Sequence, residues 1–161
     1  MDEIIRVVNT LLRREFEDRP MTCTLATATA TGRATARTMV ARELSAEGGL
    51  LFVSDRRTRK DDDLRVRPLC EVCFWLPKLN TQVRIQGQAV VIDALNDHGT
   101  RDAWWDRMDD RSVLIFSGQR GSPDQVPMPM TFELITVTPS WVTIDDYAET
   151  PPTYQTWGTR S

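Results

Sequence analysis

The feature that most constrains the fold is an alternation of polar and apolar side chains that begins at residue 82 and continues to residue 89. Polar side chains occupy four of the even positions, namely Gln82, Arg84, Gln86 and Gln88. The odd positions carry small or apolar residues, namely Val83, Ile85, Gly87, Ala89 and Val91. A period of two is that of a β-strand with one face toward a core and one toward polar surroundings. The segment therefore predicts a half-buried strand.

Shorter runs with strand character surround this segment. We expect further strands at residues 22–29, 33–42, 50–54 and 69–76, and two more at about 131–138 and 141–146. Thr31-Gly32 and Glu47-Gly48-Gly49 have the composition of turns between the first three. Many short strands with few helices predict a mainly β fold, a small β-barrel with peripheral helices.

Helical spacing is confined to the start and the late middle of the chain. Apolar residues recurring every three or four positions predict a helix within residues 1–18 that covers one open side of the core. A short helix is expected to open at Thr58, because Thr58 and Asp61 have the spacing of a capping box. Two helical stretches are expected between residues 96 and 116, and residues 147–161 indicate an extended C-terminal tail.

Composition limits the class of protein. A chain of 161 residues without repeat or linker indicates one domain over residues 1–161. The formal net charge of −3 argues against nucleic-acid binding, which depends on phosphate attraction. No apolar run approaches the roughly 20 residues that cross a bilayer, so no membrane partner is expected. Three cysteines cannot all pair within one chain, and a cytoplasmic location is the simplest setting.

A cluster of basic residues marks the strand ends near the expected short helix. It comprises Arg37, Arg42, Arg56, Arg57, Arg59 and Lys60, with the hydroxyl residues Thr38, Ser54 and Thr58 between them. Backbone N–H groups at a helix start, two cations and a hydroxyl could converge on one anion. The alternative is a solvated charged turn whose neighbouring aspartates neutralise the cations.

Other reactive residue types favour structural roles. Cys70 and Cys73 stand three apart on an expected strand and so point to opposite faces, which argues against a redox disulfide. His98 is the single histidine and we expect it to be at the surface or in a helix cap, so no metal site is predicted. Core packing or a lining role in a cofactor cleft remain alternatives for three further residues, Trp104, Trp105 and Met108.

Four ordered blocks resemble the pyridoxamine-phosphate-oxidase-like flavoproteins, and within them the cyanobacterial-type flavin-binding branch. The family pattern runs R-x-V-L-L-K, F-Y/F-T, S-R-K and R-Q-V-R-I/V-x-G. The corresponding blocks here are Arg37-Thr38-Met39-Val40-Ala41-Arg42, Leu51-Phe52-Val53-Ser54, Thr58-Arg59-Lys60 and Gln82-Val83-Arg84-Ile85-Gln86-Gly87. The resemblance covers about residues 3–138 and implies a split β-barrel homodimer that binds FMN in a cleft between subunits.

The resemblance also implies residue roles. Arg37 and Lys60 would hold the FMN phosphate, with Thr58 and Arg59 beside them. The isoalloxazine ring would lie along one strand and near the next, at Thr38, Met39, Val40, Val53 and Ser54. Gln82 would donate its amide to the ring or the ribityl chain from the other subunit.

For activity, the resemblance implies hydride transfer between N5 of the flavin and a small amine-bearing or heterocyclic substrate. NAD(P)H or oxygen would be the redox partner. Arg42, at the position of a family lysine, is the expected catalytic and substrate contact, with Arg84 a second substrate contact. The R-x-H segment of authentic pyridoxamine-phosphate oxidases is absent from residues 145–154, which argues against vitamin B6 phosphate oxidation. The alternatives are a flavin carrier or sensor without turnover, and a deazaflavin-dependent reductase of the same fold.

Overall fold

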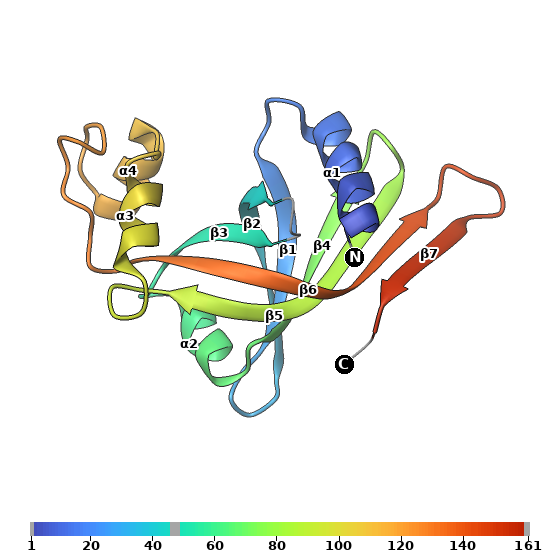
Figure 1. Ribbon diagram of the computed structural model, residues 1–161, viewed down its shortest axis with the longest axis horizontal. Helices are drawn as coiled ribbons and strands as arrows, with labels where there is room; N and C mark the ends of the chain where they lie inside the picture. Colours follow the sequence, from blue (N-terminus) through green and yellow to red (C-terminus); the bar gives the residue numbers. More distant parts are fainter. Residues whose placement is uncertain (1, 46–48, 160–161) are drawn as a thin grey trace.

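The computed structural model describes residues 2–45 and 49–159, and part of the expected turn at residues 47–49 lies outside them. Seven antiparallel strands follow the order β3-β2-β1-β4-β5-β6-β7 (Figure 1). Their bounds are Met21–Ala28 for β1, Ala34–Leu44 for β2, Leu50–Asp55 for β3, Leu69–Leu76 for β4, Thr81–Ile92 for β5, Phe132–Asp146 for β6 and Thr153–Gly158 for β7. An additional pairing of β3 with β6 closes the first six strands into a barrel. The mainly β fold predicted from the sequence is therefore confirmed.

The longest strand, β6, replaces the two strands expected at 131–138 and 141–146. It runs unbroken because β5 pairs with it from Thr81 to Ile92. The register shifts between Gln86 and Gly87, which leaves Ser140 as an extra residue on β6. A bulge of this kind accommodates Pro139, whose missing N–H would otherwise interrupt a regular ladder.

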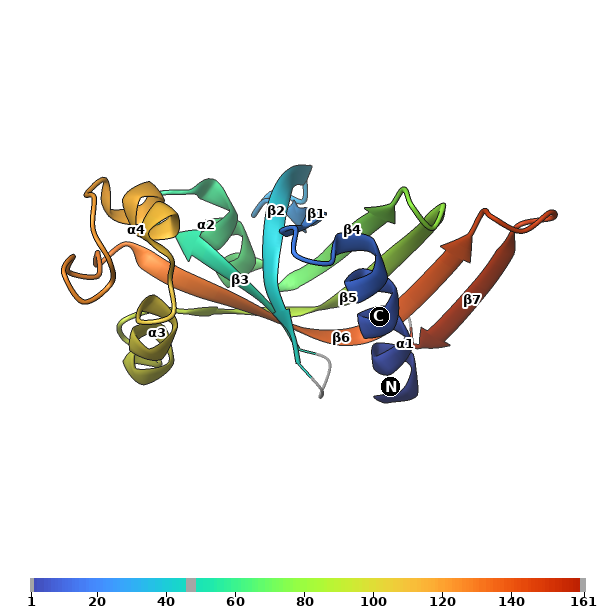
Figure 2. The same ribbon diagram turned by 90° about the horizontal axis from the view of Figure 1, so that it is seen from above.

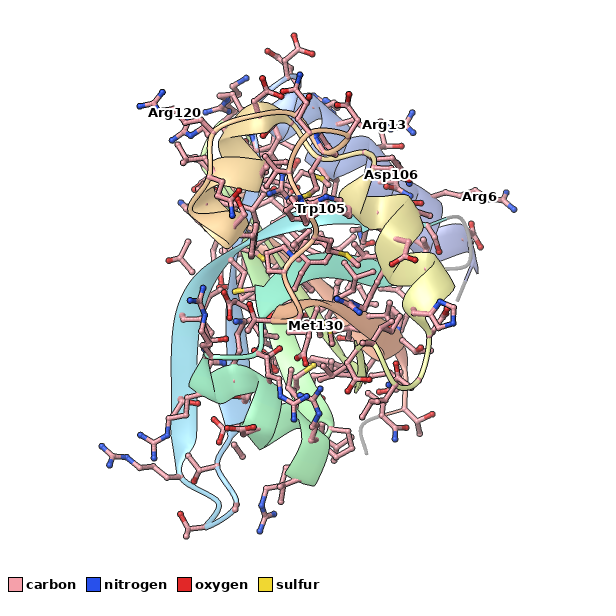
Figure 3. The ribbon with its side chains drawn as sticks, turned by 90° about the vertical axis from the view of Figure 1, so that its left-hand side faces the viewer. Arg6, Arg13, Trp105, Asp106, Arg120 and Met130 are labelled. Carbon is pink, nitrogen blue, oxygen red and sulfur yellow. The ribbon has the colours of Figure 1, made fainter. Side chains whose placement is uncertain are left out.

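The main core fills the barrel and extends to α1, Asp2–Phe16. Five apolar residues on one face of this helix are buried in that core: Ile4, Ile5, Val8, Leu12 and Phe16. Figure 3 shows Arg6 and Arg13 projecting from the opposite side of the helix. The expected amphipathic helix thus covers one open side of the barrel.

A second core lies under α3, His98–Trp105, and α4, Asp110–Ser117. The Trp105 and Phe132 rings pack edge to face with their centroids 5.1 Å apart, and Trp105 lies inside this end of the molecule in Figure 3. Met108 is buried in the same core, whereas Trp104 is partly buried against it. Two of the three residues with alternative roles are therefore core residues.

The C-terminal segment expected as a tail contains β7, which pairs with residues 141–146 of β6. The β6–β7 hairpin extends beyond the barrel at the end opposite α3 and α4 (Figures 1 and 2). Trp157 packs partly against the main core, whereas most of β7 is exposed, which explains the weak apolar pattern. Among residues 2–45 and 49–159, no helix combines the length and apolar character that a membrane crossing requires.

We expect the substitution Gly87→Ala to lower the free energy of unfolding by about 1–3 kcal/mol, because overpacking costs that much. A Cβ at this position would stand 2.3 Å from the Thr138 carbonyl oxygen, so backbone would have to move. Gly99→Ala is the matched control, since its Cβ would meet only Asp97 Oδ1 at 3.8 Å. Urea unfolding followed by circular dichroism measures both, and an unchanged midpoint for Gly87→Ala would contradict the prediction.

Candidate functional site

The barrel opens where β2 and β3 separate. Within the described residues their ladder ends at the Ala41–Phe52 pair, so the β3-facing edge of residues 37–40 has no strand beside it. On the other side of this opening, Val53 and Ser54 of β3 pair with β6 but, in the described part of the chain, not with β2. The opening therefore brings five of the predicted flavin-site residues to two facing strands: Thr38, Met39 and Val40 on β2, and Val53 and Ser54 on β3.

The three residues on β2 do not offer the same groups to this opening. Thr38 is exposed and Val40 half-buried, opposite Thr24 and Thr22 of β1. Met39 packs partly against the main core, so its side chain lies on the inner face. Its backbone remains at the edge of β2, which agrees with the prediction that this stretch uses backbone groups.

A cluster of charged and hydroxyl groups lies where β3 leads into α2, Arg59–Val66. At its centre the fully buried Asp61 carboxylate has its two oxygens 2.6 and 2.8 Å from Ser54 Oγ. Thr58 Oγ1 lies 2.6 Å from Asp61 Oδ2 and accepts a short hydrogen bond from Lys60 Nζ. Lys60 Nζ is also 3.4 Å from Asp61 Oδ2, and only 9% of the lysine side chain is exposed. We call these four residues the Asp61 cluster.

The capping box expected at Thr58 is wrong. Thr58 is the N-cap residue in backbone conformation, but its side chain does not cap the helix. Its hydroxyl bonds the Asp55 carbonyl and the Asp61 carboxylate instead. An aspartate three residues into the motif is too short to reach back as a glutamate does, and here it turns toward Ser54.

The basic residues between 56 and 60 differ in their surroundings, so an anion site and a solvated charged turn each describe some of them. Lys60 is buried in the Asp61 cluster, as an anion site requires. Arg56, Arg57 and Arg59 are exposed, and Arg57 forms an ion pair with Asp55 at 2.6 Å. Most of this turn is therefore a solvated charged surface, and only its last cation faces inward.

Arg37 is held in place by the first β-hairpin. Its Nη1 donates to the Leu25 carbonyl at 3.1 Å and to Thr27 Oγ1 at 2.8 Å, and its Nη2 donates to Thr35 Oγ1 at 2.7 Å. Desolvation lowers the pKa of Arg37, against the attraction of Asp63 and Asp61 on α2, which raises it. The charges of the two aspartates thus act on the guanidinium, although its three hydrogen bonds join it to the first hairpin.

Arg37 and the Asp61 cluster together fit a phosphate group. The contacts of Arg37 use three of the five N–H donors of a guanidinium, which leaves donors for an anion. Lys60 adds a buried ammonium that donates to the Thr58 hydroxyl and makes a long, 3.4 Å contact with Asp61 Oδ2. Charge-assisted donors of this kind are what a phosphate monoester needs. Asp63, whose buried Oδ2 has no hydrogen-bond partner among the described residues, opposes that charge.

Gln82 and Arg84 lie on the outer face of the barrel, away from the Asp61 cluster. The registers place four residues in one row across β2, β1, β4 and β5, namely Thr38, Thr24, Cys73 and Arg84. Three strand spacings therefore separate β2 from the strand that carries Gln82 and Arg84. Gln82 Nε2 donates to Asp145 Oδ2 at 3.1 Å. Within one chain, Gln82 therefore does not join the other predicted flavin residues.

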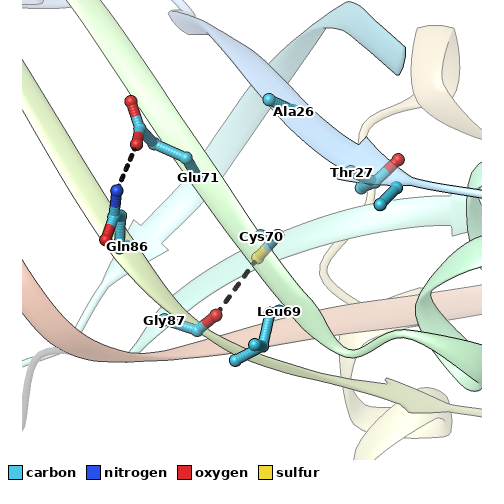
Figure 4. Close-up of a pocket in the computed structure, with 8 residues that line it drawn as sticks. Ala26, Thr27, Leu69, Cys70, Glu71, Gln86 and Gly87 are labelled. Carbon is cyan, nitrogen blue, oxygen red and sulfur yellow. Dashed lines mark hydrogen bonds between the residues drawn. The ribbon is translucent and has the colours of Figure 1, made fainter. Parts of the chain in front are cut away.

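Arg84 belongs to a polar network on the same face. Its guanidinium is 3.8 Å from Glu71 Oε1 and 3.8 Å from Asp145 Oδ2, and it lies over the Trp141 ring. Glu71 also accepts a hydrogen bond from Gln86 at the edge of a hollow of about 290 Å³ (Figure 4). Two carboxylates beside one arginine make this network negative.

Arg42 reaches a different part of the molecule. The β2–β3 register shifts between Ala41 and Glu43, so Arg42 stands at a bulge and is exposed. Its Nη2 donates to Ser112 Oγ of α4 at 3.3 Å. Ser112 is not predictable from the sequence, because no local pattern joins residues 70 apart in the chain. The partners of Arg37 could have been found, since the turn at Gly32 sets Thr27 opposite Thr35.

The remaining candidates have structural roles. All three cysteines are free, and His98 is exposed at the start of α3, where Asp97 rather than the histidine provides the cap. The part of the chain that the structure describes contains no group of three or more side chains suited to hold a metal ion.

The fold is that of a split-barrel protein, with the Asp61 cluster as a candidate anion site where β3 leads into α2. Comparison with known families identifies it further, because residues 5–93 match the model of the pyridoxamine 5'-phosphate oxidase FMN-binding domain. That match spans more than half of the chain, and the protein belongs to this family. FMN is the cofactor that the family's domain binds.

Curated relatives are pyridoxine/pyridoxamine 5'-phosphate oxidases. The chain is 38% identical over 73 residues to that of Acinetobacter baumannii, which covers 45% of this chain and 33% of the relative. It is 39% identical over 69 residues to that of Burkholderia cenocepacia, and this alignment covers 43% of this chain and 32% of the relative. The alignments thus span about a third of the length of these relatives.

Solved structures share the fold over nearly the whole chain. An FMN-binding protein of Nostoc punctiforme, related to pyridoxamine 5'-phosphate oxidase, has a TM-score of 0.82 at 21% identity and is covered to 96%, with 97% of this chain covered. PhzG from Burkholderia lata, solved with tetrahydrophenazine-1-carboxylic acid, has a TM-score of 0.79 at 18% identity, covering 98% of this chain and 85% of PhzG. These likenesses confirm the split-barrel fold.

We expect Cys73 to be the one cysteine that reacts in the folded protein. Burial raises the pKa of Cys23 and Cys70 from 9.0 to about 12, and the thiolate is the reactive form. Their thiolate fraction near pH 8 should be on the order of a thousandfold below that of an ordinary thiol. Burial also raises the pKa of Cys73, but this residue is only half-buried and lines an outer hollow.

Titration with 5,5'-dithiobis(2-nitrobenzoate) near pH 8 checks this order of reactivity. One thiol should react in the native protein and three in concentrated guanidinium chloride, and Cys73→Ser should abolish the native reaction. Rapid native modification of Cys23 or Cys70 would show that the barrel opens more readily than its packing implies.

Proposed function

We propose that this protein is an FMN-dependent oxidoreductase that acts on a small amine-bearing or heterocyclic substrate. The observations that carry the proposal are buried Lys60 in the Asp61 cluster and an Arg37 guanidinium on which the charges of Asp61 and Asp63 act. Bound FMN supplies the redox chemistry, since its N5 accepts and returns a hydride. The chain's own residues bind and orient the cofactor and the substrate.

Each residue at the opening has a role in this proposal. Arg37 and Lys60 bind the phosphate, with Thr58 and exposed Arg59 beside it. The free edge of β2 at residues 38–40 offers backbone groups to the polar edge of the ring, and Val53 and Ser54 border it from β3. The Ser54 hydroxyl is engaged by Asp61, so Ser54 also positions the cluster.

A second copy of the chain completes the site in this proposal. Gln82 lies on β5, three strand spacings from β2 in the sheet, and an amide so far away contributes to the same flavin only from a partner subunit. The outer face that carries Gln82 also carries three exposed residues, Thr24, Thr38 and Trp75. This face, which also carries Cys73 opposite Thr24, is where we place the dimer contact, so dimer formation should slow the reaction of the Cys73 thiol.

Arg42 is the proposed substrate contact at the rim. Its hydrogen bond to Ser112 fixes the guanidinium beside the N-terminus of α4, where Asp109 caps the helix through the Ser112 N–H at 2.6 Å. A fixed cation at this rim suits an electron-rich or anionic substituent of the substrate. NAD(P)H or oxygen serves as the redox partner.

Replacing Arg37 or Lys60 by alanine should weaken FMN binding about 10–100-fold, because each change removes charge-assisted hydrogen bonds worth about 1.5–3 kcal/mol. Flavin fluorescence quenching measures the affinity. Arg6→Ala and Arg13→Ala are controls, because both cations are exposed and project from the outer side of α1. Affinity equal to wild type in both site variants would refute the phosphate assignment.

Asp63→Asn should act in the opposite direction. Removing a carboxylate that opposes the phosphate should tighten FMN binding on the order of threefold to tenfold, at surface-like effective dielectric. The same fluorescence titration measures it, with thermal unfolding to show that the fold survives. Weaker binding with an unchanged melting temperature would mean that Asp63 supports the cations rather than competing for them.

Turnover separates an enzyme from a carrier or sensor. We expect stopped-flow mixing of the FMN-loaded protein with NADPH or NADH to bleach the flavin spectrum, and oxygen or a substrate to restore it. Arg42→Ala should slow the substrate-dependent step without changing FMN affinity. A flavin that stays oxidised with both nucleotides and with candidate substrates would favour the carrier, and a protein that refuses FMN would favour a deazaflavin.

A further inference from the structure

A hollow of about 510 Å³ lies on the outer face between β5, β6 and β7, apart from the Asp61 cluster. It is lined by Arg84, Trp141, Thr143, Asp145, Tyr154 and Thr156. The register sets Thr143 between Arg84 and Thr156, and Asp145 between Gln82 and Tyr154. The β6–β7 hairpin therefore forms a wall of this hollow, a role that a disordered tail could not fill.

Two polar groups of the hollow have no hydrogen-bond partner among the described residues. Thr143 is 4% exposed, and its Oγ1 is buried and unpartnered. Arg84 Nε is likewise buried without a hydrogen bond, because Asp145 Oδ2 stands off at 3.8 Å. A buried polar group left without a partner costs on the order of 1–3 kcal/mol, so a ligand that meets both groups recovers that energy.

The donors and acceptors of the hollow define what such a ligand must offer. Arg84 Nε can only donate, and therefore requires an acceptor such as a carbonyl oxygen. The Asp145 carboxylate can only accept and so requires an N–H, while the Thr143 hydroxyl can do either. A carboxamide or a ring lactam presents a carbonyl and an N–H side by side.

The charge of the hollow disfavours an anion. Arg84 is flanked by Asp145 and Glu71, each at 3.8 Å, so one positive charge faces two negative ones. A carboxylate brought to Arg84 would meet both of them in a partly desolvated site, where like charges repel strongly. An uncharged group makes the same hydrogen bonds without that cost.

The side chains that line the hollow favour a flat ligand. Tyr154 is 65% exposed in the free chain and stands opposite Asp145, and the Trp141 ring lies under the Arg84 guanidinium. Aromatic rings and a guanidinium plane are suited to flat ligands. Asp145 also accepts from Gln82, so the hollow adjoins the residue that the proposed function assigns to the flavin of the partner subunit.

We infer that this hollow binds a planar heteroaromatic group bearing an uncharged carboxamide or lactam edge, and that it is the subsite for the substrate or the redox partner. Its assignment as the subsite for the substrate or the redox partner rests on the proposed function, whereas the chemistry of the ligand does not. Arg84 and Thr143 bind the carbonyl, and Asp145 accepts from the N–H. Arg84, expected to be a substrate contact, thereby selects an uncharged polar group rather than an acid.

Nicotinamide is the probe, because it is a small heteroaromatic carboxamide, and nicotinate is its charged counterpart. Isothermal titration calorimetry on the FMN-loaded full chain should show nicotinamide binding at least fivefold tighter than nicotinate. Thr143→Val, which replaces the hydroxyl by a methyl group, should weaken the binding of nicotinamide about five- to tenfold. Thr138→Val is the matched control on the same strand outside the hollow and should bind as wild type does.

A separate variant tests the effect of the negative charge beside Arg84. Asp145→Asn should narrow the preference for nicotinamide over nicotinate, because it removes one of the two carboxylates beside Arg84. Flavin absorbance is recorded with every variant, so that loss of cofactor is seen independently of loss of the probe.

Three results would overturn the inference: no nicotinamide binding to wild type, equal binding to Thr143→Val, or tighter binding of nicotinate. Each leaves FMN retention, and so the proposed function, untouched. If wild type does not retain FMN, the proposed function fails, and the same titration on the flavin-free chain still decides whether the hollow binds the probe.

Discussion

The pairing of β3 with β6 is the constraint on which the rest of the structure depends. It closes six strands into a barrel, with residues 50–55 of β3 paired to β6 along one edge. Along the other edge of β3, the ladder with β2 ends at the Ala41–Phe52 pair, beyond the register shift at Arg42, and the opening lies there. It leaves one edge of β2 available at the point where β3 delivers the chain into α2, so that backbone groups and cations meet there.

A single buried carboxylate organises the cations at this opening. Asp61 holds Ser54, Thr58 and Lys60 in one network and also acts on Arg37. A buried charge is tolerated only when it is compensated, which ties the position of Lys60 to the integrity of the fold. The arrangement thus separates the cation that faces inward from its exposed neighbours, although all stand together in the sequence.

Local patterns were sufficient to predict most of the fold. Period-two alternation located β5, and β4 was predicted with the observed bounds, because each strand has one buried face. The same reasoning failed at β6, where a bulge carries the chain past Pro139, and at β7, whose exposure removes the apolar signal. At the site, residue types indicated the cations, but Asp61 as their centre and Ser112 beside Arg42 depend on tertiary contacts that no short-range spacing encodes.

The three hydrogen bonds that the first hairpin makes to Arg37 have a consequence for recognition. A free arginine side chain on a surface samples many rotamers, and fixing it costs on the order of 1.5–2 kcal/mol of conformational entropy. Here the hydroxyls of Thr27 and Thr35 fix the guanidinium during folding, before any anion arrives. The hairpin therefore converts part of the stability of the sheet into preorganisation, so that association with an anion loses little side-chain entropy at this residue.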